Sequence, residues 1–354
     1  MNEAFAQRQP AYSIHQLTSY FFKLGYSGFG GPVALVGYMH RDLVENKRWF
    51  SEEDYREGLA LAQLAPGPLA AQLSIYLGFV HYRYIGATLT GIAFVLPSFA
   101  MVVCLGIAYK IFGGLPWMQA VFYGVGAAVV GIIALSSYKL TTKSVSKLTV
   151  KAFRMNWLLW ILFFVSLSIT FISQSEEIFL FIFAGLIYMT VKSPPRRFAA
   201  YKSVSPLLLF SGIGFWGYNS ESLSRLAVFF FKAGAFVFGS GLAIIPFLHG
   251  GVVNQYHWLT ETEFIDAVAV AMITPGPVVI TVGFIGYLVG GFPGATIASL
   301  ATFFPCYLFT VIPAPYFRKY ANNHSIRAFV DGITAAVAGA LVAAVMIIAS
   351  GSIR

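Results

Sequence analysis

The stretch Leu61-Ala62-Gln63-Leu64-Ala65-Pro66-Gly67-Pro68-Leu69-Ala70 places Pro-Gly-Pro inside an apolar run from Gly58 to Val80. A proline inside a helix removes a backbone donor and clashes with the carbonyl four residues earlier, at a cost of about 3 kcal/mol. In a bilayer the freed backbone group finds no water to bind. A second apolar run contains the same break, Thr274-Pro275-Gly276-Pro277. We therefore expect both runs to be helices interrupted at these motifs.

The composition predicts an all-α polytopic membrane protein. Of the 354 residues, 58% are hydrophobic and only 10% are charged, whereas soluble domains carry about 25% charged residues. Apolar runs long enough to cross a bilayer recur along the chain, which predicts about ten transmembrane helices. The candidate segments are Ile14–Tyr38, Gly58–Val80, Ile85–Phe112, Met118–Tyr138, Trp157–Ile172, Ile178–Val191, Leu226–Leu248, Phe264–Val289, Ala295–Phe317 and Ala328–Ala349.

The net charge of +9 comes from basic residues beside the apolar runs rather than from a basic domain. The positive-inside rule predicts that the loops 139–154 and 192–202 are cytoplasmic if the chain has ten spans, and we expect the cytoplasmic (inner) membrane. Attraction to anionic lipid headgroups explains this charge, so nucleic-acid binding is not expected. Cys104 and Cys306 lie in different apolar runs, so we expect no disulfide framework, no metal site and no cofactor.

An internal repeat organises the chain. Residues 21–68 align without a gap onto residues 230–277, with matched prolines, tryptophans and a histidine. After a one-residue slip the match continues, so that Pro97 meets Pro305. Shared apolar composition does not explain such matches, and we infer two homologous copies of one unit.

The copies suggest a division of the chain into three parts. Residues 1–192 form an N-terminal repeat with two extra membrane segments, residues 193–205 a basic linker, and residues 206–354 a C-terminal repeat. Matched broken helices in two repeats indicate a transporter whose site lies between the repeats. Ten full spans would make the copies parallel, and the basic loops slightly favour that arrangement.

Each copy contains two breaks where an anion could bind. The first is Gly28-Phe29-Gly30-Gly31-Pro32, matched by Phe238-Gly239-Ser240-Gly241, and the second is Pro-Gly-Pro. Proline suits the first turn of a helix. The unpaired amides after such a start, together with the helix dipole, attract anions. The alternative is a packing kink. The candidate substrate-binding residues are Lys23, Gly30, Gly31, Pro32, Gln63, Pro66, Gly67, Pro68, Lys232, Gly239, Ser240, Gly241, Thr274, Pro275, Gly276 and Pro277.

Charged and titratable residues recur at matched positions in the two copies. Lys23 and Lys232 could attract an anionic substrate or could extend their ammonium groups to the membrane surface. The candidates for proton coupling are Glu57, Asp266, His40 and His249. The alternatives are that the carboxylates stabilise the first turns of helices and that the histidines are polar loop residues. Gln63 aligns with Met272, so any role of Gln63 would be confined to one copy.

These motifs resemble the signature of the chromate ion transporter (CHR) family. The likeness lies in Phe22-x-x-Gly25 with Phe29-Gly30-Gly31-Pro32, and in Ala62-Gln63-Leu64-Ala65-Pro66-Gly67-Pro68. The second copy is similar to the degenerate C-terminal repeat of that family, and the likeness covers residues 14 to 350. The chain looks like the fused two-repeat form. The resemblance implies chromate efflux driven by the proton motive force, with sulfate as a related anion, and oppositely oriented halves.

Several functions remain as alternatives to chromate efflux. The first is uptake or exchange of sulfate or another small anion, since sulfate is also a tetrahedral dianion. The second is a membrane-embedded enzyme acting on lipids, which the scarcity of intramembrane carboxylates disfavours, and the third is a non-transporting scaffold. We expect a transporter and not an enzyme, with an oxyanion, protons and the bilayer as partners and a homodimer left open. The residues alone indicate an oxyanion, and the resemblance indicates chromate.

Overall fold

The computed structural model describes residues 11–113, 156–173, 178–194, 220–235, 244–317 and 323–352, together with Gly241 and scattered positions between 120 and 145. These residues form helices and no strand, which confirms the all-α class. The principal elements are α1 (Ile14–Ser27), α2 (Gly31–Met39), η1 (His40–Asn46), α3 (Glu52–Leu64), α4 (Leu69–Phe112), α7 (Trp157–Ser173), α8 (Ile178–Lys192), α9 (Ser220–Ala235), α10 (Ile244–His249), η4 (Gly250–Gln255), α11 (Glu261–Ile273), η5 (Val278–Ile280), α12 (Thr281–Val311), η6 (Ala314–Tyr316) and α14 (His324–Ser352).

The two copies fold alike, down to unusual backbone features. Helices α3 and α11 begin and end at aligned residues, and a π-helix, η1 or η4, precedes each of them. Arg48 and His257 are aligned and have φ values of 53° and 50°. The glycines of the two Pro-Gly-Pro motifs also have positive φ, 141° at Gly67 and 97° at Gly276. The structure therefore contains the repeat that the sequence predicts.

The first break in copy one is the tip of a hairpin. The Tyr20 hydroxyl donates to the carbonyl oxygen of Tyr38 at 3.4 Å, so α2 runs back alongside α1 after the turn at Gly28–Gly30. Gly30 and Gly31 make this turn with φ values of 103° and 74°. The expectation of one spanning segment over Ile14–Tyr38 is therefore wrong, because a left-handed glycine pair reverses the chain where a kink would only bend it.

Pro-Gly-Pro forms the tip of a second hairpin, between α3 and α4. A side chain at Gly58 would clash with Tyr76 and Leu73, so α3 and the first part of α4 lie side by side. The expected broken span Gly58–Val80 is likewise a reversal. Each arm is too short to cross a bilayer alone, since thirteen residues of α3 extend about 20 Å.

Helix α4 contains another reversal, at Arg83. This residue has φ 53° and ψ −140°, values outside the helical region. The Thr90 hydroxyl donates to the carbonyl oxygen of Ser74 at 2.8 Å, which brings the segments on the two sides of Arg83 together. The equivalent residue of α12 is Gly291, with φ 61° and ψ −152°. In each copy a long helical segment follows this reversal, residues 84–112 in α4 and 292–311 in α12.

The long segments of α4 and α12 pack against each other in opposite directions. Thr88 and Tyr307 are joined by a hydrogen bond of 2.9 Å, and the rings of Phe99 and Phe292 are 6.2 Å apart. As α4 advances from residue 88 to residue 99, its contacts on α12 therefore move backward. Equivalent segments of the two copies run in opposite directions, which agrees with the family resemblance. The preference for parallel copies, drawn from the basic loops, is wrong because the hairpins change the number of crossings.

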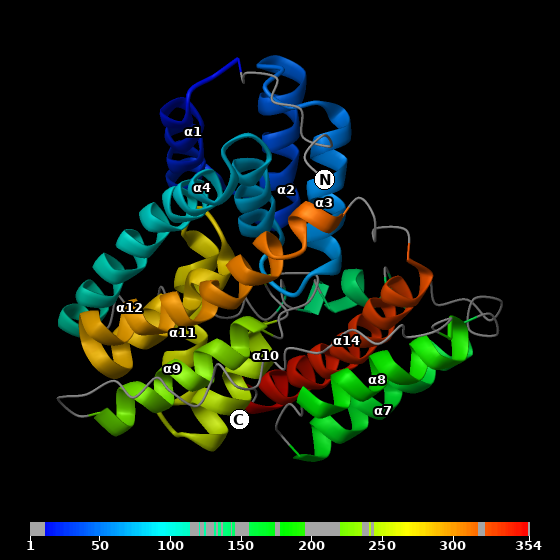
Figure 1. Cartoon of the computed structure of the whole chain (residues 1–354). Coiled ribbons are helices and arrows are strands. Elements are labelled where there is room, and N and C mark those ends of the chain that lie inside the picture. Colours follow the sequence, from blue (N-terminus) through cyan, green and yellow to red (C-terminus); the bar gives the residue numbers. More distant parts are fainter. Residues whose placement is uncertain are drawn as a thin grey trace.

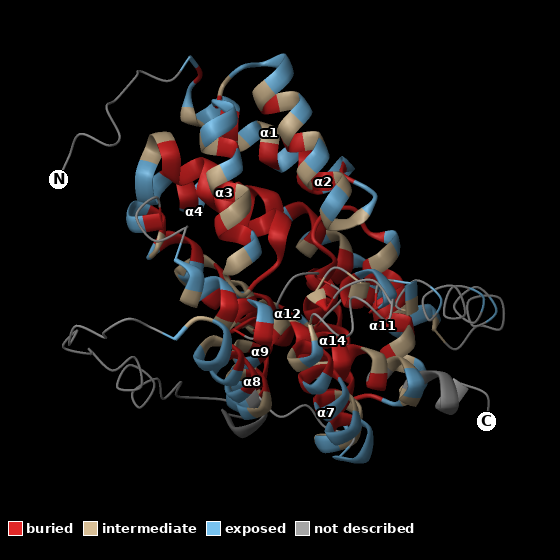
Figure 2. Ribbon diagram, turned by 90° about the vertical axis from the view of Figure 1, so that its right-hand side faces the viewer, coloured by how far each residue is buried: buried red, intermediate tan, exposed pale blue. Residues whose placement is uncertain are grey.

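Helices α7, α8 and α14 form a separate layer, at the lower right of Figure 1. The long helices α4 and α12 lie side by side, with α1–α3 on one side of them and α9–α11 on the other (Figure 1). Buried residues gather along α4, α12 and α14, whereas the outer surfaces of α1 and α7 are largely exposed (Figure 2).

Three helical stretches of the described chain are long and apolar enough to cross a membrane. They are Leu69–Phe112, Val278–Tyr316 and His324–Ile347, and the shorter apolar helices are Trp157–Ser173 and Phe179–Lys192. Among the basic residues, Lys139 and Lys192 are exposed, while most of the loops 139–154 and 192–202 lie outside the described residues. The sidedness of these loops and the proposed domain limits remain predictions.

Candidate functional site

The tip of the second hairpin in copy one places the start of a helix in a buried part of the protein. Helix α4 begins one residue after Pro68, and no side chain caps its first amides. Its first three residues are buried: Leu69, Ala70 and Ala71. A buried helix N-terminus leaves backbone N–H groups without partners. Such amides, with the positive end of the helix dipole, form an anion-binding arrangement.

The corresponding tip in copy two is fastened to copy one. The backbone N–H of Gly276 donates to the carbonyl oxygen of Gly28 at 2.9 Å. The Ser98 hydroxyl, on α4, lies 2.9 Å from the carbonyl oxygen of Pro275 and 3.1 Å from that of Gly25. Because Gly25 and Gly28 end the first arm of the copy-one hairpin, one tip from each copy meets at this point.

Each of the two Pro-Gly-Pro tips packs against the other copy. Gly276 lies against Ser98 of α4, and Gly67 lies against Cys306 of α12. Ser98 and Cys306 occupy aligned positions in the two long helices. Each tip therefore rests on the long helix of the other copy. A displacement of one copy relative to the other would change the surroundings of both tips.

The first breaks approach the same region. Pro32 stands at the start of α2, whose N-cap residue Gly30 makes no side-chain hydrogen bond. A side chain at Gly241 would come within 3.3 Å of Val279 and 3.9 Å of Pro32. The structure thus brings Pro32, Gly241 and the copy-two Pro-Gly-Pro tip together. Gly239 and Ser240 lie outside the described residues and remain candidates from sequence alone.

Several other predicted site residues are exposed, or carry a hydroxyl that is already paired. Lys23, Lys232 and Gln63 are exposed. Lys23 lies on the face of α1 that also exposes Phe22 and Tyr26, at 44% and 48%. Exposure of an apolar face with one lysine suits a surface in contact with lipid at least as well as a binding site. Thr274 is buried, but its hydroxyl donates to the carbonyl oxygen of Val270 at 2.6 Å within its own helix.

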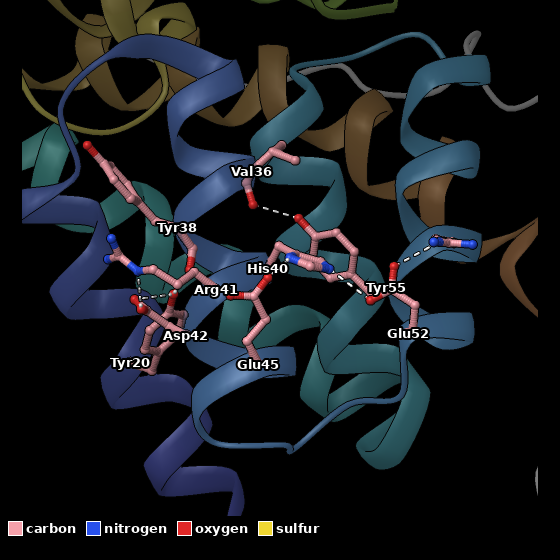
Figure 3. A network of polar contacts seen from close by, with 10 residues as sticks. Tyr20, Val36, Tyr38, His40, Arg41, Asp42, Glu45, Glu52 and Tyr55 are labelled. Atoms are coloured by element: carbon pink, nitrogen blue, oxygen red, sulfur yellow. Dashed lines mark hydrogen bonds and ion pairs between the residues drawn. The ribbon is translucent and has the colours of Figure 1, made fainter.

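Each copy contains a histidine–glutamate pair at the entry to its second hairpin. His40 Nε2 lies 2.8 Å from Glu52 Oε2, and His249 Nε2 lies 2.8 Å from Glu261 Oε2. Figure 3 shows the copy-one pair, with Glu45 on the other ring nitrogen of His40 at 3.1 Å. The hydrogen bond to His40 is the main cause that holds the pKa of Glu52 below its usual value. Both histidines begin or adjoin a π-helix, a feature that often marks functional sites.

The two matched carboxylates differ in their surroundings. Asp266 is buried and accepts a hydrogen bond of 2.7 Å from the Tyr109 hydroxyl on α4 of the other copy. Glu57 is half-buried on α3. The residue aligned with Tyr109 is Phe317, which has no hydroxyl. This hydrogen bond between the copies therefore has no counterpart at the aligned positions Phe317 and Glu57.

A cavity of about 480 Å³ lies between α4 and α12. Aligned residues of the two copies line it in pairs, including Thr88 with Thr296 and Phe99 with Tyr307. Its wall is almost entirely apolar and carries no charged side chain. An oxyanion would lose its hydration there without replacement hydrogen bonds. We therefore place the candidate site at the tips and not in this cavity.

Sequence reasoning missed Ser98, Tyr109 and the glutamate partners of the histidines. Ser98 could have been suspected because it aligns with Cys306, which lies in the matched apolar run of the other copy. Glu52 and Glu261 were aligned in the repeat, but their spacing of twelve residues from the histidines corresponds to no helical face. Only the hairpin geometry brings the pairs together.

Comparison with known proteins places the chain in a family. The sequence profile of the chromate transporters matches residues 15–189 and 224–354, which include both copies. The chain belongs to the chromate transporter family. It is 61% identical to the chromate transport protein of Cupriavidus metallidurans over 348 residues, covering 97% of this chain and 84% of that protein.

Further relatives show the same extent of similarity. A probable chromate transport protein of Synechococcus elongatus is 56% identical over 98% of this chain and 87% of that protein. The chromate transport protein of Pseudomonas aeruginosa is 29% identical over 93% of this chain and 80% of that protein. No solved structure matches the chain. The family thus extends across the inverted copies and all four breaks.

Proposed function

We propose that this protein exports chromate across the cytoplasmic membrane, driven by the proton motive force. Its relatives named as chromate transport proteins are up to 61% identical over nearly the whole chain, which supports chromate as the cargo. The inside-negative membrane potential favours the outward movement of an anion. Export therefore needs a path for the anion and a means of exposing its site to the two sides in turn.

The oxyanion binds at the start of α4, next to Pro66, Gly67 and Pro68. The observation that carries this assignment is the buried, uncapped N-terminus of α4. Its free amides can donate to oxyanion oxygens, and the dipole adds roughly half a positive charge. No lysine or arginine is needed at the contact, which agrees with the exposed positions of Lys23 and Lys232.

Alternating access follows from the inverted copies. Equivalent hairpins open toward opposite sides, and the tips meet through Gly28 and Gly276. Rocking of one copy against the other would expose the tips to each side in turn, as in other transporters built from inverted repeats. The exchanged packing of Gly67 on Cys306 and Gly276 on Ser98 couples the two tips to the same movement.

Protons enter through the matched titratable groups. Asp266 is the strongest candidate because it is buried and contacts Tyr109 of the other copy. Glu57 holds the matched position in copy one. His40 and His249, each hydrogen-bonded to a glutamate, are the second pair of candidates for proton coupling.

The proposal is tested by flux of labelled chromate from proteoliposomes that contain a pH-sensitive dye. We expect Pro68→Ala and Pro277→Ala each to abolish chromate flux while the protein still inserts and folds. Pro293→Ala is the matched control, because Pro293 is exposed beside the turn at Gly291. Normal flux in both tip variants would contradict binding at the half-helix starts.

The alternative cargo is sulfate or another small anion, carried inward or by exchange. Sulfate has the same tetrahedral shape, and a site at the N-terminus of a helix accepts either ion. Counterflow of labelled sulfate in the same vesicles separates the cases. Sulfate flux without chromate flux would replace chromate as the cargo and leave the site assignment intact.

A further inference from the structure

The carbonyl oxygens of the two Pro-Gly-Pro tips bind side chains from different copies. In copy two, the carbonyl oxygen of Pro275 lies 2.9 Å from the Ser98 hydroxyl, which belongs to copy one. In copy one, the aligned carbonyl oxygen of Pro66 accepts a hydrogen bond of 2.8 Å from Gln72 Nε2, which belongs to the same copy. The copy-two tip is therefore bonded to the other copy, whereas the copy-one tip is bonded within its own hairpin.

The bonds at the copy-two tip hold it against copy one. The Ser98 hydroxyl also lies 3.1 Å from the carbonyl oxygen of Gly25, and the backbone N–H of Gly276 donates to the carbonyl oxygen of Gly28 at 2.9 Å. Ser98 itself is fully buried. Separating this tip from copy one would leave buried polar groups without partners, which is unfavourable in an apolar environment. We therefore expect this contact to persist when the copies move.

The copy-one tip rests on a residue that binds it less strongly. Cys306 is aligned with Ser98, and its Sγ lies 3.1 Å from the position that a Cβ of Gly67 would occupy. A thiol is only a weak hydrogen-bond donor. Within the described part of copy two, no group forms a hydrogen bond to Pro66, Gly67 or Pro68. Among these residues, movement of the tip across Cys306 would break only van der Waals contacts.

Resting on the proposed function, we propose that Ser98 is a positioning residue that makes the copy-two tip the pivot of the transporter. Ser98 holds Pro275 and Gly276 against copy one while the two copies rock. The copy-one tip, which carries the anion at the start of α4, moves across Cys306 in the same step. Transporters with inverted repeats expose their site by such movement of one repeat against the other. The hydroxyl at position 98 and the thiol at position 306 thus give the two aligned tips different roles.

The backbone after each tip agrees with these roles. In copy two, the 3₁₀ turn η5 follows Pro277, and the N–H of Ile280 donates to the carbonyl oxygen of Pro277 at 2.9 Å. In copy one, α4 begins directly after Pro68, and its first amides have no side-chain cap. The copy-two tip thus uses a backbone donor within its own turn, whereas the copy-one tip leaves its donors for an anion.

The native thiol of Cys306 reports movement of the copy-one tip directly. Cys104, the other cysteine of the chain, is exposed and is replaced by alanine. In proteoliposomes, N-ethylmaleimide should label the buried Cys306 slowly without an anion, and at least about tenfold faster when chromate drives turnover. Mass spectrometry counts the maleimide adduct and separates it from any thiol that chromate has oxidised.

A thiol near the pivot is the matched probe. Val102 is fully buried one turn after Ser98, and its Cγ2 would lie 3.2 Å from a side chain at Gly283 of copy two. With Cys104 and Cys306 both replaced by alanine, the Val102→Cys protein should react no faster when chromate is added. Adding Ser98→Ala should loosen the pivot, and the labelling rate of this protein should then rise at least about tenfold with chromate.

Transport kinetics separate positioning by Ser98 from a merely structural contact. Ser98→Ala should lower the maximal chromate flux at least about tenfold and should leave the half-saturating chromate concentration within about twofold, because the tip that binds the anion is unchanged. Ser166→Ala, which removes an equally buried hydroxyl from α7, is the control and should leave both values unchanged.

In vesicles that show chromate flux, three results would overturn the pivot. They are labelling of Cys306 that does not respond to chromate, equally fast labelling of Cys306 and of the Val102→Cys protein, and equal flux in Ser98→Ala and Ser166→Ala. If Ser98→Ala fails to fold, the first two comparisons still decide, because both keep Ser98. Absence of chromate flux from the wild-type protein would instead overturn the proposed function.

Discussion

The backbone N–H of Gly276 donates to the carbonyl oxygen of Gly28 at 2.9 Å, and this bond joins a tip of one copy to a tip of the other. Both residues belong to breaks that the sequence already marks as exceptional. The bond satisfies two backbone groups that would otherwise be unpaired inside the protein. It also means that the copies cannot separate at this point without losing a hydrogen bond in an apolar environment.

Gly276→Ala should disrupt this junction. Gly276 has φ 97°, and a side chain there would clash with Ser98 and approach the Gly25 carbonyl oxygen to 3.0 Å. We expect a loss of stability of at least about 1–3 kcal/mol, from strain and overpacking together. Thermal unfolding in detergent measures this loss, and chromate flux should fall with it.

The matched control for this substitution is Gly37→Ala in α2. A side chain at Gly37 meets nothing within 4 Å, and its backbone is helical. This change should be neutral or should stabilise the protein by about 0.5–1 kcal/mol. Equal melting temperatures for Gly276→Ala and Gly37→Ala would show that the junction contributes nothing to the stability of the protein.

The aligned turns at Arg83 and Gly291 allow backbone strain to be measured directly. Both residues have positive φ and strongly negative ψ, a conformation that a residue with a side chain adopts at a cost of about 1–3 kcal/mol. A side chain at Gly291 would meet no atom within 4 Å, so Gly291→Ala should lower stability by strain alone. Arg83→Gly should relieve strain but lose the stacking of the guanidinium on Phe79, 5.6 Å from its ring centroid.

Gly290→Ala is the control for this pair of variants. Its φ is −133°, and the new side chain would only touch Leu223 at 3.4 Å. Thermal unfolding should therefore separate Gly291→Ala from Gly290→Ala by more than about 1 kcal/mol. If the neighbouring variants are equally stable, the turn is not strained.

The sequence indicates the positions of the breaks but not the direction that the chain takes after them. A proline and a glycine in an apolar run are compatible with a kink, a half-helix or a reversal, since all three begin with the same lost hydrogen bond. The direction is shown by the packing of Gly58 against Tyr76 and by the hydrogen bond from the Tyr20 hydroxyl to the carbonyl oxygen of Tyr38. These contacts join residues separated by nearly twenty positions, beyond the range of any local pattern.

The candidate site, too, could be predicted only in part from the sequence. Pro66, Gly67 and Pro68 were identified because backbone chemistry is local, and the structure places them at a buried helix start. Gln72 could be suspected as a polar residue in an apolar run, but only the structure shows that it is fully buried and that its Oε1 has no hydrogen-bond partner. Lys23 and Lys232 are candidates because charge is rare in apolar runs, and the structure shows that both are exposed, as expected of lysines that extend to the membrane surface.

Tyr109 and Asp266 join the two copies on one side of the structure only. Tyr109→Phe should lower stability by about 1.5–3 kcal/mol, because a hydrogen bond to a carboxylate is lost and Asp266 stays buried. Asp266→Asn should cost less, since an amide can still accept from the hydroxyl. A double-mutant cycle, measured by thermal unfolding, should give a coupling energy above about 0.5 kcal/mol.

Tyr307→Phe is the matched control for Tyr109→Phe. The Tyr307 hydroxyl pairs with Thr88, an exposed and uncharged partner, at 2.9 Å. Its removal should change stability by no more than about 0.5 kcal/mol. If Tyr109→Phe and Tyr307→Phe lower the free energy of unfolding equally, the hydrogen bond to Asp266 stabilises the protein no more than the uncharged one does. If Asp266→Asn also keeps proton-coupled flux, Asp266 does not carry the coupling proton.

The pair of His40 and Glu52 should make stability depend on pH in the acidic range. Hydrogen bonding from His40, with a further contribution from Arg56, lowers the pKa of Glu52. A carboxylate with a depressed pKa in the folded state stabilises the protein above its ordinary pKa, and this stabilisation is lost as pH falls through the lower value. The wild-type protein should therefore exceed His40→Gln in stability at neutral pH, and the difference should vanish on acidification below the usual carboxylate range.

Thermal unfolding of both proteins across that range measures the effect, with His15→Gln as the control because His15 is exposed on α1. Glu45, which contacts the other nitrogen of His40 at 3.1 Å, should be replaced in a second background to separate its share. His249→Gln should weaken the matching pair with Glu261, whose histidine is 5% exposed by side chain against 31% for His40. A stability difference that stays constant from neutral to acidic pH would exclude the pair as the pH-dependent contact.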